Sequence, residues 1–259
     1  MEQTERTGRA ERRPMIEVRG LYKRFGEHEV LRGIDLAVEE GSTVVILGGS
    51  GSGKTVLMKH MIGLLKPDQG QVLVEGEDIV PLEPAELELV RRKFGMVFQA
   101  AALFDSMTVF ENVSFPLREH TRMNEGQMRE IVRQKLDIVG LREIEEKYPA
   151  ELSGGMRKRV GLARAIVMDP KIVLYDEPTT GLDPITTEYV DDMILEAKAK
   201  LGVTSVVISH DVASSFKVAD KIAFLSGGHI VEQGPPSRLR NATHPALKQF
   251  LHSWFEKNE

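Results

Sequence analysis

The chain contains no cysteine, which excludes disulfides, thiol catalysis and thiolate metal sites. It also lacks a long apolar run: Val44–Leu47, before the first glycine-rich loop, is far too short to cross a bilayer. Residues 1–14 are charged and have no apolar centre, so we expect a disordered tail and not a signal peptide. A basic surplus is missing as well, because the formal net charge is -5. This charge balance does not favour nucleic acid as a partner.

What the 259 residues do contain is typical of a globular protein, with 41% hydrophobic and 28% charged residues. Short aliphatic runs alternate with helical patterns, which predicts an α/β fold with a largely parallel sheet. The expected strands are Met15–Val18, Thr43–Leu47, Gln71–Val74, Met96–Phe98, Ile172–Tyr175, Ser205–Ser209, Lys221–Leu225 and His229–Gln233. The expected helices are Lys54–Leu65, Glu125–Val139, Gly154–Val167, Thr186–Leu201 and Pro245–Phe255. Strand signals thin out between Gln99 and Asp169, so Ala100–Val167 is expected to form a helical subdomain inserted into the α/β core.

A glycine-rich loop separates an expected strand from an expected helix and fits the pattern G-x-x-x-x-G-K-[ST]. Its residues are Gly48, Gly49, Ser50, Gly51, Ser52, Gly53, Lys54 and Thr55. Glycines allow backbone N–H groups to turn toward a phosphate, and the helix that follows adds its N-terminal dipole. Lys54 would supply a cation to the β- and γ-phosphates, and the Thr55 hydroxyl would ligate Mg²⁺. ATP and Mg²⁺ are therefore the expected cofactors, against the alternative of a glycine-rich turn with an incidental lysine.

Two acids, Asp176 and Glu177, follow the expected strand Ile172–Tyr175. The carboxyl end of a parallel strand is where α/β sheets bind ligands. Consecutive strand residues point to opposite sides, so the two acids cannot share one role. We expect Asp176 to be a Mg²⁺ ligand and Glu177 to be the general base that polarises the attacking water. The alternative is a pair of solvated acids at a strand end.

The segment Leu152-Ser153-Gly154-Gly155-Met156 precedes an expected helix and lies shortly before the acid pair. Together with the phosphate loop, this order of motifs resembles the ABC-transporter ATPase family over essentially the whole chain after the tail. Met156 stands where the family usually has glutamine. We expect Ser153, Gly154 and Gly155 to form an N-terminal anion site on their helix, against the alternative of a serine that caps an ordinary helix. In the family this second site binds the γ-phosphate held by another protomer, which implies a head-to-tail dimer around two ATP molecules.

The resemblance also implies a division of the chain. It assigns a RecA-like P-loop NTPase core with a mixed sheet to residues 15–99 and 168–240. It assigns a helical subdomain to residues 100–167 and an amphipathic C-terminal helix to residues 241–259.

Further roles come from the same resemblance. Phe25 resembles the aromatic residue that stacks on adenine, with Tyr22 as a rival. Gln99 resembles the glutamine that senses Mg²⁺ and the attacking water, so it counts as both a catalytic residue and a metal ligand. Asp183 resembles the D-loop residue at the dimer interface, and His210 the switch histidine that contacts the γ-phosphate.

Two features near these motifs carry separate expectations. Val56 follows Thr55, where the family often has a second hydroxyl that reaches the α-phosphate. Because a neutral hydrogen bond contributes about 1 kcal/mol, we expect somewhat weaker ATP binding. The basic run Arg157–Arg159 is expected to be a solvated helix face.

Within the family, four stretches resemble the ATPases of Mla/Mce-type lipid transporters. They are residues 98–104, 109–113, 115–120 and 183–186. This implies lipid movement between bacterial membranes by a subunit bound to the cytoplasmic face of the inner membrane. The implied partners are a permease dimer, an Mce-type lipid-binding protein and a small regulatory subunit. Two alternatives stay open: an importer ATPase for an amino acid, metal or other small solute, and an ABC ATPase without transport that acts on DNA or the ribosome.

Two sets of apolar residues each have alternative interpretations. The first either lines a groove for a permease helix or belongs to the core, and it comprises Phe104, Phe110, Phe115 and Leu117. The second forms a helical stripe that packs on the chain's own core, on a twin subunit or on a regulatory partner. It comprises Leu247, Phe250, Leu251, Trp254 and Phe255.

Overall fold

The computed structural model describes residues 14–255, and for Phe255 it describes the backbone alone. The tail expected over residues 1–14 therefore lies outside the described residues except for Pro14, and so do residues 256–259. Within the described range, no helix combines the length and the apolar character that are needed to cross a membrane.

The strands of residues 14–255 form two sheets. The smaller, antiparallel sheet has the order β2-β1-β4-β5, and the larger sheet has the order β10-β9-β3-β8-β7-β6. In the larger sheet β10 is antiparallel to β9, and the other neighbours are parallel. The smaller sheet consists of β1 (Pro14–Phe25), β2 (His28–Glu39), β4 (Gln69–Val74) and β5 (Glu77–Asp78). The larger consists of β3 (Thr43–Leu47), β6 (Phe94–Val97), β7 (Ile172–Asp176), β8 (Thr204–Ser209), β9 (Lys221–Ser226) and β10 (His229–Gly234).

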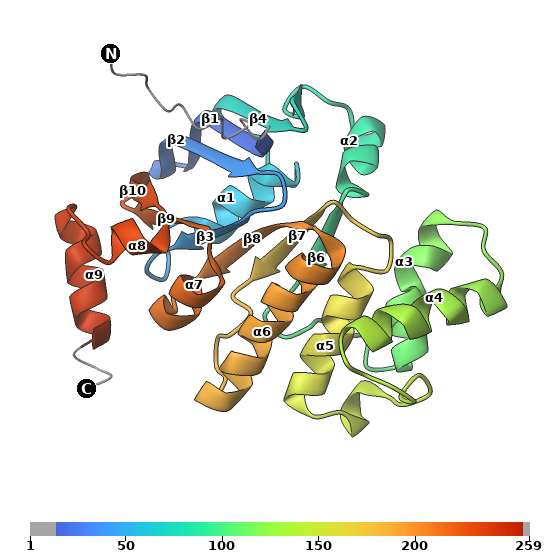
Figure 1. Cartoon of the computed structure of the whole chain (residues 1–259). Coiled ribbons are helices and arrows are strands. Elements are labelled where there is room, and N and C mark those ends of the chain that lie inside the picture. Colours follow the sequence, from blue (N-terminus) through green and yellow to red (C-terminus); the bar gives the residue numbers. More distant parts are fainter. Residues whose placement is uncertain (1–13, 256–259) are drawn as a thin grey trace, which may run out of the picture.

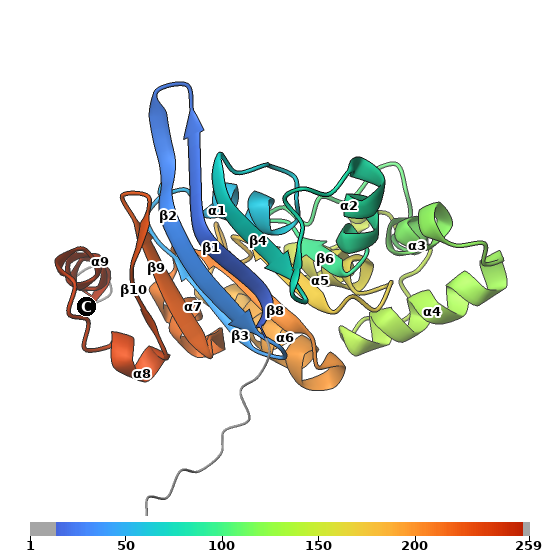
Figure 2. The same cartoon turned by 90° about the horizontal axis from the view of Figure 1, so that it is seen from above.

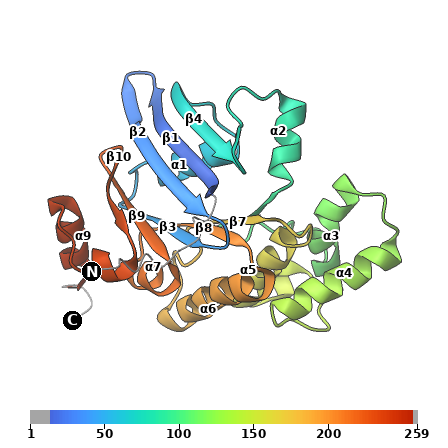
Figure 3. The same ribbon diagram turned by 45° about the horizontal axis from the view of Figure 1, so that its top comes forward.

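Helices pack on both faces of the larger sheet (Figures 1 and 3). The segment between β6 and β7 is called the insertion. The helices outside it are α1 (Lys54–Met61), α2 (Pro84–Arg91), α6 (Pro184–Leu201), α7 (Val212–Val218), α8 (Pro236–Leu239) and α9 (Pro245–Phe255). Between β6 and β7 the chain forms α3 (Val109–His120), α4 (Glu125–Ile138), the 3-10 helix η1 (Pro149–Glu151) and α5 (Gly154–Ala165). Figure 3 shows α5, α6 and α7 on the face of the larger sheet that is turned away from β1, β2 and β4. The mixed-sheet α/β fold predicted from the sequence is confirmed.

The larger sheet divides the hydrophobic core into two parts. All five residues of β3 are buried, which is typical of a parallel strand covered on both faces. Val45 and Leu47 belong to the part of the core that also contains residues of α3, α4, α5, α6 and α7. Val44 and Ile46 pack with α1 and the antiparallel sheet. Strand β3 is therefore held from both sides at the point where the glycine-rich loop begins.

Several elements differ from the sequence-based expectations. Strand β2 was not expected, although it pairs with β1 along most of its length. Helix α1 ends at Met61 and not at Leu65, because Gly63 adopts a left-handed backbone with φ 64°. Helix α3 was not expected either, since it contains Pro116, a residue that usually breaks helices. Figure 2 shows the end of the β1–β2 hairpin projecting beyond the rest of the molecule.

The C-terminal helix α9 has the expected bounds. Leu247 and Leu251 are buried in the main core, and the Phe250 ring lies 5.1 Å from the Phe224 ring, centroid to centroid. Trp254 is partly buried against the same core, whereas the Phe255 side chain lies outside the described residues. Of the three alternatives for the apolar stripe, packing on the chain's own core is the one observed.

Candidate functional site

The glycine-rich loop joins the end of β3 to the start of α1. The Gly48 N–H donates to the Ser209 carbonyl at 3.3 Å, which ties the loop to the end of β8. A Cβ atom at Gly48 would lie 2.4 Å from the Leu225 carbonyl oxygen, so only glycine fits there. Gly51 and Gly53 have φ of 75° and 103°, a backbone region that favours glycine. Helix α1 therefore begins at Lys54 with its N-terminus open to the loop.

Lys54 is buried and turned back into this loop. Its ammonium donates to the carbonyl oxygens of Gly48 and Gly49, each at 3.0 Å, and lies 3.3 Å from Glu177 Oε1. The Ser52 hydroxyl is buried without a hydrogen-bond partner, whereas Ser50 is exposed. The loop thus presents a cation and an unused donor to the same space.

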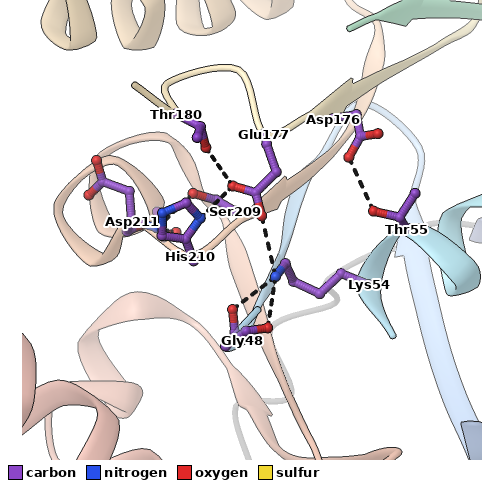
Figure 4. Close-up of polar contacts among 11 residues, drawn as sticks. Gly48, Lys54, Thr55, Asp176, Glu177, Thr180, Ser209, His210 and Asp211 are labelled. Carbon is purple, nitrogen blue, oxygen red and sulfur yellow. Dashed lines mark hydrogen bonds and ion pairs between the residues drawn. The ribbon is translucent and has the colours of Figure 1, made fainter. Parts of the chain in front are cut away.

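Asp176 is the last residue of β7 and Glu177 follows it, and their side chains contact different neighbours (Figure 4). Asp176 Oδ1 accepts a hydrogen bond from the Thr55 hydroxyl at 3.5 Å. Burial, and then repulsion from Glu177, raise the pKa of Asp176 above its usual value. A buried carboxylate with a raised pKa is stabilised by a nearby cation, which suits a metal ligand.

Glu177 lies at the centre of the polar contacts in Figure 4. Its backbone has φ 51°, which is uncommon for a residue with a Cβ atom and is typically found at functional sites. Its Oε2 accepts a hydrogen bond from the Thr180 hydroxyl at 2.8 Å and lies 2.6 Å from His210 Nδ1. Burial alone would raise the pKa of Glu177, but the Thr180 hydroxyl, Lys54 and His210 outweigh it and hold the pKa below its usual value. Glu177 is therefore an ionised carboxylate near neutral pH, as a general base must be.

The end of β8 supplies His210 to this group. The imidazole is half exposed, with 51% of the side chain accessible. Directly after it, Asp211 caps α7, because its side chain accepts from the Ser214 N–H at 3.1 Å. The structure thus brings together Lys54, Thr55 and the acid pair with His210, although they come from three separate parts of the sequence.

Other predicted residues lie apart from these contacts. Gln99 follows β6 with an exposed side chain and takes part in none of the hydrogen bonds of the described residues. Asp183 caps α6 by accepting from the Thr186 N–H at 3.0 Å. Ser153 caps α5 by accepting from the Met156 N–H at 3.2 Å. Gly154 lies exposed beside it, and Gly155 is partly exposed. Within one chain these caps do not reach the phosphate loop by any contact that the structure describes.

Phe25 stands at the end of β1 with 48% of its surface exposed. The Lys23 ammonium lies 5.5 Å from the centre of its ring. The rival Tyr22 is exposed as well, but its hydroxyl reaches the strand opposite, where a Cβ atom at Gly33 would lie 2.8 Å from it. Phe25 is therefore the freer of the two rings to stack on a ligand.

The residues present fit a triphosphate and Mg²⁺. A Cβ atom at Gly49 or Gly51 would meet no atom within 4 Å, so the loop is open on the side that a phosphate needs. Thr55 and Asp176 offer a hydroxyl and a carboxylate, the groups that proteins use for a Mg²⁺ ion that also binds nucleotide phosphates. Among residues 14–254 there is no cluster of three or more His, Asp and Glu that would hold a metal alone.

Sequence reasoning was wrong about Lys158, which was expected on a solvated helix face. Lys158 is buried in α5, and its ammonium donates to the Pro178 carbonyl, directly after Glu177. Burial lowers the pKa of Lys158. Only Arg157 of the basic run is exposed. Thr180 was also missed, and its position three residues after Glu177 was the available signal.

The apolar set after β6 divides between core and surface. Phe110 and Leu117 are buried, so they belong to the core. Phe104 and Phe115 lie with their ring centres 5.2 Å apart and line a groove of about 620 Å³. Arg164 donates to the carbonyl oxygens of Ala101 and Ala102, which fixes the loop at one side of this groove.

Residues 31–180 match the family described as "ABC transporter". The chain is 44% identical to the "Probable ribonucleotide transport ATP-binding protein mkl" of Mycobacterium leprae, over 92% of this chain and 68% of that protein. It spans 66% of the length of the mkl protein of Mycobacterium bovis. It is 40% identical to the "Intermembrane phospholipid transport system ATP-binding protein MlaF" of Escherichia coli K12, over 92% of this chain and 88% of that protein.

Solved structures agree with these relatives. The structure of cbiO1 from Clostridium perfringens, described as part of the ABC transporter complex cbiONQ, has a TM-score of 0.82 at 29% identity and covers 88% of this chain and 91% of its own. The dimeric cassette MJ0796 bound to ADP and Pi has a TM-score of 0.76 at 32% identity and covers 86% of this chain and 99% of its own. Because both fold and sequence agree over most of the chain, it belongs to the ABC transporter family as an ATP-binding cassette with ATPase activity.

Proposed function

We propose that this chain powers a separate membrane permease that moves phospholipids or other lipids between bacterial membranes. The observation that carries the proposal is the 40% identity, over 92% of this chain, to proteins named for intermembrane phospholipid transport in Escherichia coli and Haemophilus influenzae. A chloroplast protein of Arabidopsis thaliana whose name contains a galactolipid, TRIGALACTOSYLDIACYLGLYCEROL 3, is 41% identical over 91% of the chain. The subunit would lie at the cytoplasmic face of the inner membrane.

ATP binding is assigned to the loop and to Phe25. Gly48 through Gly53 would direct backbone N–H groups at the phosphates, with Lys54 between the β- and γ-phosphates. Val56 would lie near the α-phosphate, and Phe25 would stack on adenine. Lys54 must then exchange its contacts with two carbonyl oxygens and Glu177 for phosphate oxygens. This exchange would free the Glu177 carboxylate for water.

Hydrolysis is assigned to Glu177 and His210, with Gln99 contributing from the loop after β6. Glu177 would accept a proton from the attacking water, and the Thr180 hydroxyl would favour the ionised carboxylate for that step. His210 would hold Glu177 and the γ-phosphate in line. When bound to Thr55, Asp176 and Gln99, Mg²⁺ would neutralise charge on the phosphate oxygens.

Dimerisation would complete each site. The exposed N-terminus of α5, with Ser153, Gly154, Gly155 and Met156, makes none of the described contacts with the phosphate loop within residues 14–255 and would bind the γ-phosphate of a second copy. Asp183 would lie at the interface between the two copies. Residues 15–99 and 168–240 would then act as the nucleotide-binding core, and residues 100–167 as the helical subdomain that moves with the partner's ATP.

The groove lined by Phe104 and Phe115 would receive a helix of the permease, since these two rings give it an apolar surface and it adjoins the loop after Gln99. An Mce-type lipid-binding protein and a small regulatory subunit would complete the assembly. Nucleic acid is not among the proposed partners.

Ribonucleotide transport is a second candidate, because the mycobacterial mkl proteins that carry that name are 44% identical to this chain. Lipid transport is preferred because the MlaF proteins match this chain over a larger share of their own length, 88% against 68%.

The decisive experiment is reconstitution with the permease that co-purifies with the full chain. Donor vesicles would carry a fluorescent phospholipid, and its transfer to unlabelled acceptor vesicles would be followed after addition of Mg-ATP. We expect transfer with the native chain and none with Glu177→Gln, which keeps binding but loses the base. Transfer of a radiolabelled ribonucleotide, without lipid transfer, would reject the lipid proposal and favour the second candidate.

A further inference from the structure

Helices α6 and α7 pack against each other, and each begins beside a residue of the proposed site. Helix α6 starts after its cap Asp183, and α7 starts after His210 with Asp211 as its cap. A contact between the two helices would therefore link the proposed dimer interface to the proposed switch histidine.

Such a contact exists deep in the interior. Asp191 on α6 is 4% exposed, and Ser214 on α7 is 2% exposed. The Ser214 hydroxyl donates to Asp191 Oδ1. A buried carboxylate costs free energy unless hydrogen bonds or cations compensate it, and an apolar residue would fill the position at lower cost. The cost of burying an acid at this position indicates a role other than packing.

Ser214 connects Asp191 to the start of α7. Besides the hydroxyl bond, its backbone N–H donates to Asp211 Oδ1 at 3.1 Å. The Asp211 N–H in turn donates to the Ser209 hydroxyl at 2.9 Å. His210 lies between these two residues, with Nδ1 2.6 Å from Glu177 Oε2. The first turn of α7 is thus held from one side by Asp191 and from the other by the end of β8.

The charges around Asp191 compensate its buried carboxylate only in part. Burial raises the pKa of Asp191 to about 6, and the Ser214 hydroxyl and Lys217 act against that rise. Lys217 lies 2.8 Å from Asp192 Oδ1 and 3.7 Å from Glu188 Oε1, so its charge is shared with other acids. The hydrogen bond from Ser214 is therefore the closest compensation that Asp191 has.

We propose that Asp191 is a positioning residue. It acts through Ser214 to hold the first turn of α7, so that the His210 imidazole keeps its contact with the Glu177 carboxylate. The proposal rests on the proposed roles of His210 and Glu177 in hydrolysis. It assigns no contact with ATP to Asp191 itself.

Two substitutions at this position separate positioning from packing. Asp191→Leu keeps the branching at Cγ with two larger methyl groups, removes the buried charge and loses the acceptor, so the link to Ser214 is lost while an apolar side chain fills the site. Asp191→Asn keeps an oxygen that accepts from Ser214. Asp192→Leu is the matched control, because this neighbour is exposed and pairs only at the surface.

The first measurement is steady-state ATP hydrolysis by the full chain at pH 7.5. We expect kcat to fall about tenfold or more in Asp191→Leu, since small misplacements of catalytic groups cost up to a hundredfold. KM for ATP should stay within twofold, because Asp191 does not touch the phosphate loop. Asp191→Asn and Asp192→Leu should keep kcat within about twofold of the native chain.

The second measurement reads His210 without requiring turnover. Imidazole ¹H–¹⁵N spectra of the full chain contain seven histidines, and a His210→Gln variant would assign the signal of His210. We expect that signal to shift in Asp191→Leu and in Ser214→Ala, and to stay in place in Asp191→Asn and Asp192→Leu.

The two measurements also separate this inference from the proposed function. A native chain without ATPase activity, whose His210 signal still shifts in Asp191→Leu, would reject the proposed hydrolysis roles and keep the positioning. Unchanged kcat and an unchanged His210 signal in folded Asp191→Leu would overturn the positioning role and leave the ATPase standing. Equal losses in Asp191→Leu and Asp191→Asn would overturn it too, because the amide preserves the link.

Discussion

At the residue scale, Glu177 shows how opposing effects set one side chain's chemistry. Burial favours the protonated acid, while Thr180, Lys54 and His210 favour the carboxylate and outweigh it. Its neighbour Asp176 experiences the opposite balance, since burial and the charge of Glu177 raise its pKa. Two adjacent acids therefore differ because of their partners, with one suited to proton transfer and the other to a metal ion.

Val56 offers a residue-scale prediction. A hydroxyl at this position of α1 would add one hydrogen bond toward the proposed α-phosphate position. We expect Val56→Thr to bind ATP about fivefold more tightly, which corresponds to about 1 kcal/mol. Titration with a fluorescent ATP analogue would measure the Kd. Val56→Ala is the control, because it changes the side chain without adding a donor, and no gain for threonine over alanine would contradict the prediction.

At the element scale, helices matter here for what they fix at their ends. Helices α5, α6 and α7 each begin with a cap whose side chain accepts from a backbone N–H, namely Ser153, Asp183 and Asp211. All three caps are candidate site residues or direct neighbours of one. Lys158 adds a tie between α5 and the backbone that follows Glu177. Movement of these helices would therefore displace residues next to the proposed catalytic base, Glu177.

Helix α9 supports a prediction about stability. Leu247 is 1% exposed and packs on the main core, so Leu247→Ala should leave a cavity. We expect the free energy of unfolding to fall by about 2–5 kcal/mol. Urea denaturation followed by circular dichroism would measure it. Gln249→Ala, on the exposed side of the same helix, should change stability by less than about 0.5 kcal/mol. Equal effects of the two substitutions would show that α9 does not belong to the core.

At the scale of the whole molecule, the two parts of the proposed ATP site lie on different elements of one chain. The phosphate loop and the acid pair make contact with each other, whereas the start of α5 is exposed and takes part in none of their described contacts. The MJ0796 cassette, 32% identical to this chain, is described as dimeric. A second copy would bring the start of its α5 to the phosphate loop.

Dimerisation is the whole-molecule prediction. With Glu177→Gln and Mg-ATP, the full chain should elute at twice the monomer mass in size-exclusion chromatography with light scattering, because ATP is bound but not hydrolysed. Removing Mg²⁺ with EDTA should return it to the monomer. Adding Lys54→Ala to the same variant is the control and should abolish the dimer. A mass that never changes with nucleotide, also beside the permease, would refute the shared site.

Local patterns were enough for part of this structure. The phosphate loop, the acid pair and His210 follow short buried strands, and such strands are recognisable from runs of aliphatic residues. Strand β2 was missed because it is rich in charged residues and contains Gly33, so its burial depends on pairing with β1. Helix α3 was missed because of Pro116, whose cost is offset by burial of Phe110, Val113 and Leu117.

By itself, the sequence determined the family, the mixed α/β fold and the order of the motifs, because these depend on residue types at short, regular spacing. Only the tertiary structure decided that Lys158 is buried beside Pro178, that α9 covers the chain's own core and that Asp191 meets Ser214. These contacts join residues on separate elements, and no short-range pattern encodes which faces of two helices will meet. These contacts are determined by how the helices pack on the two faces of the central sheet.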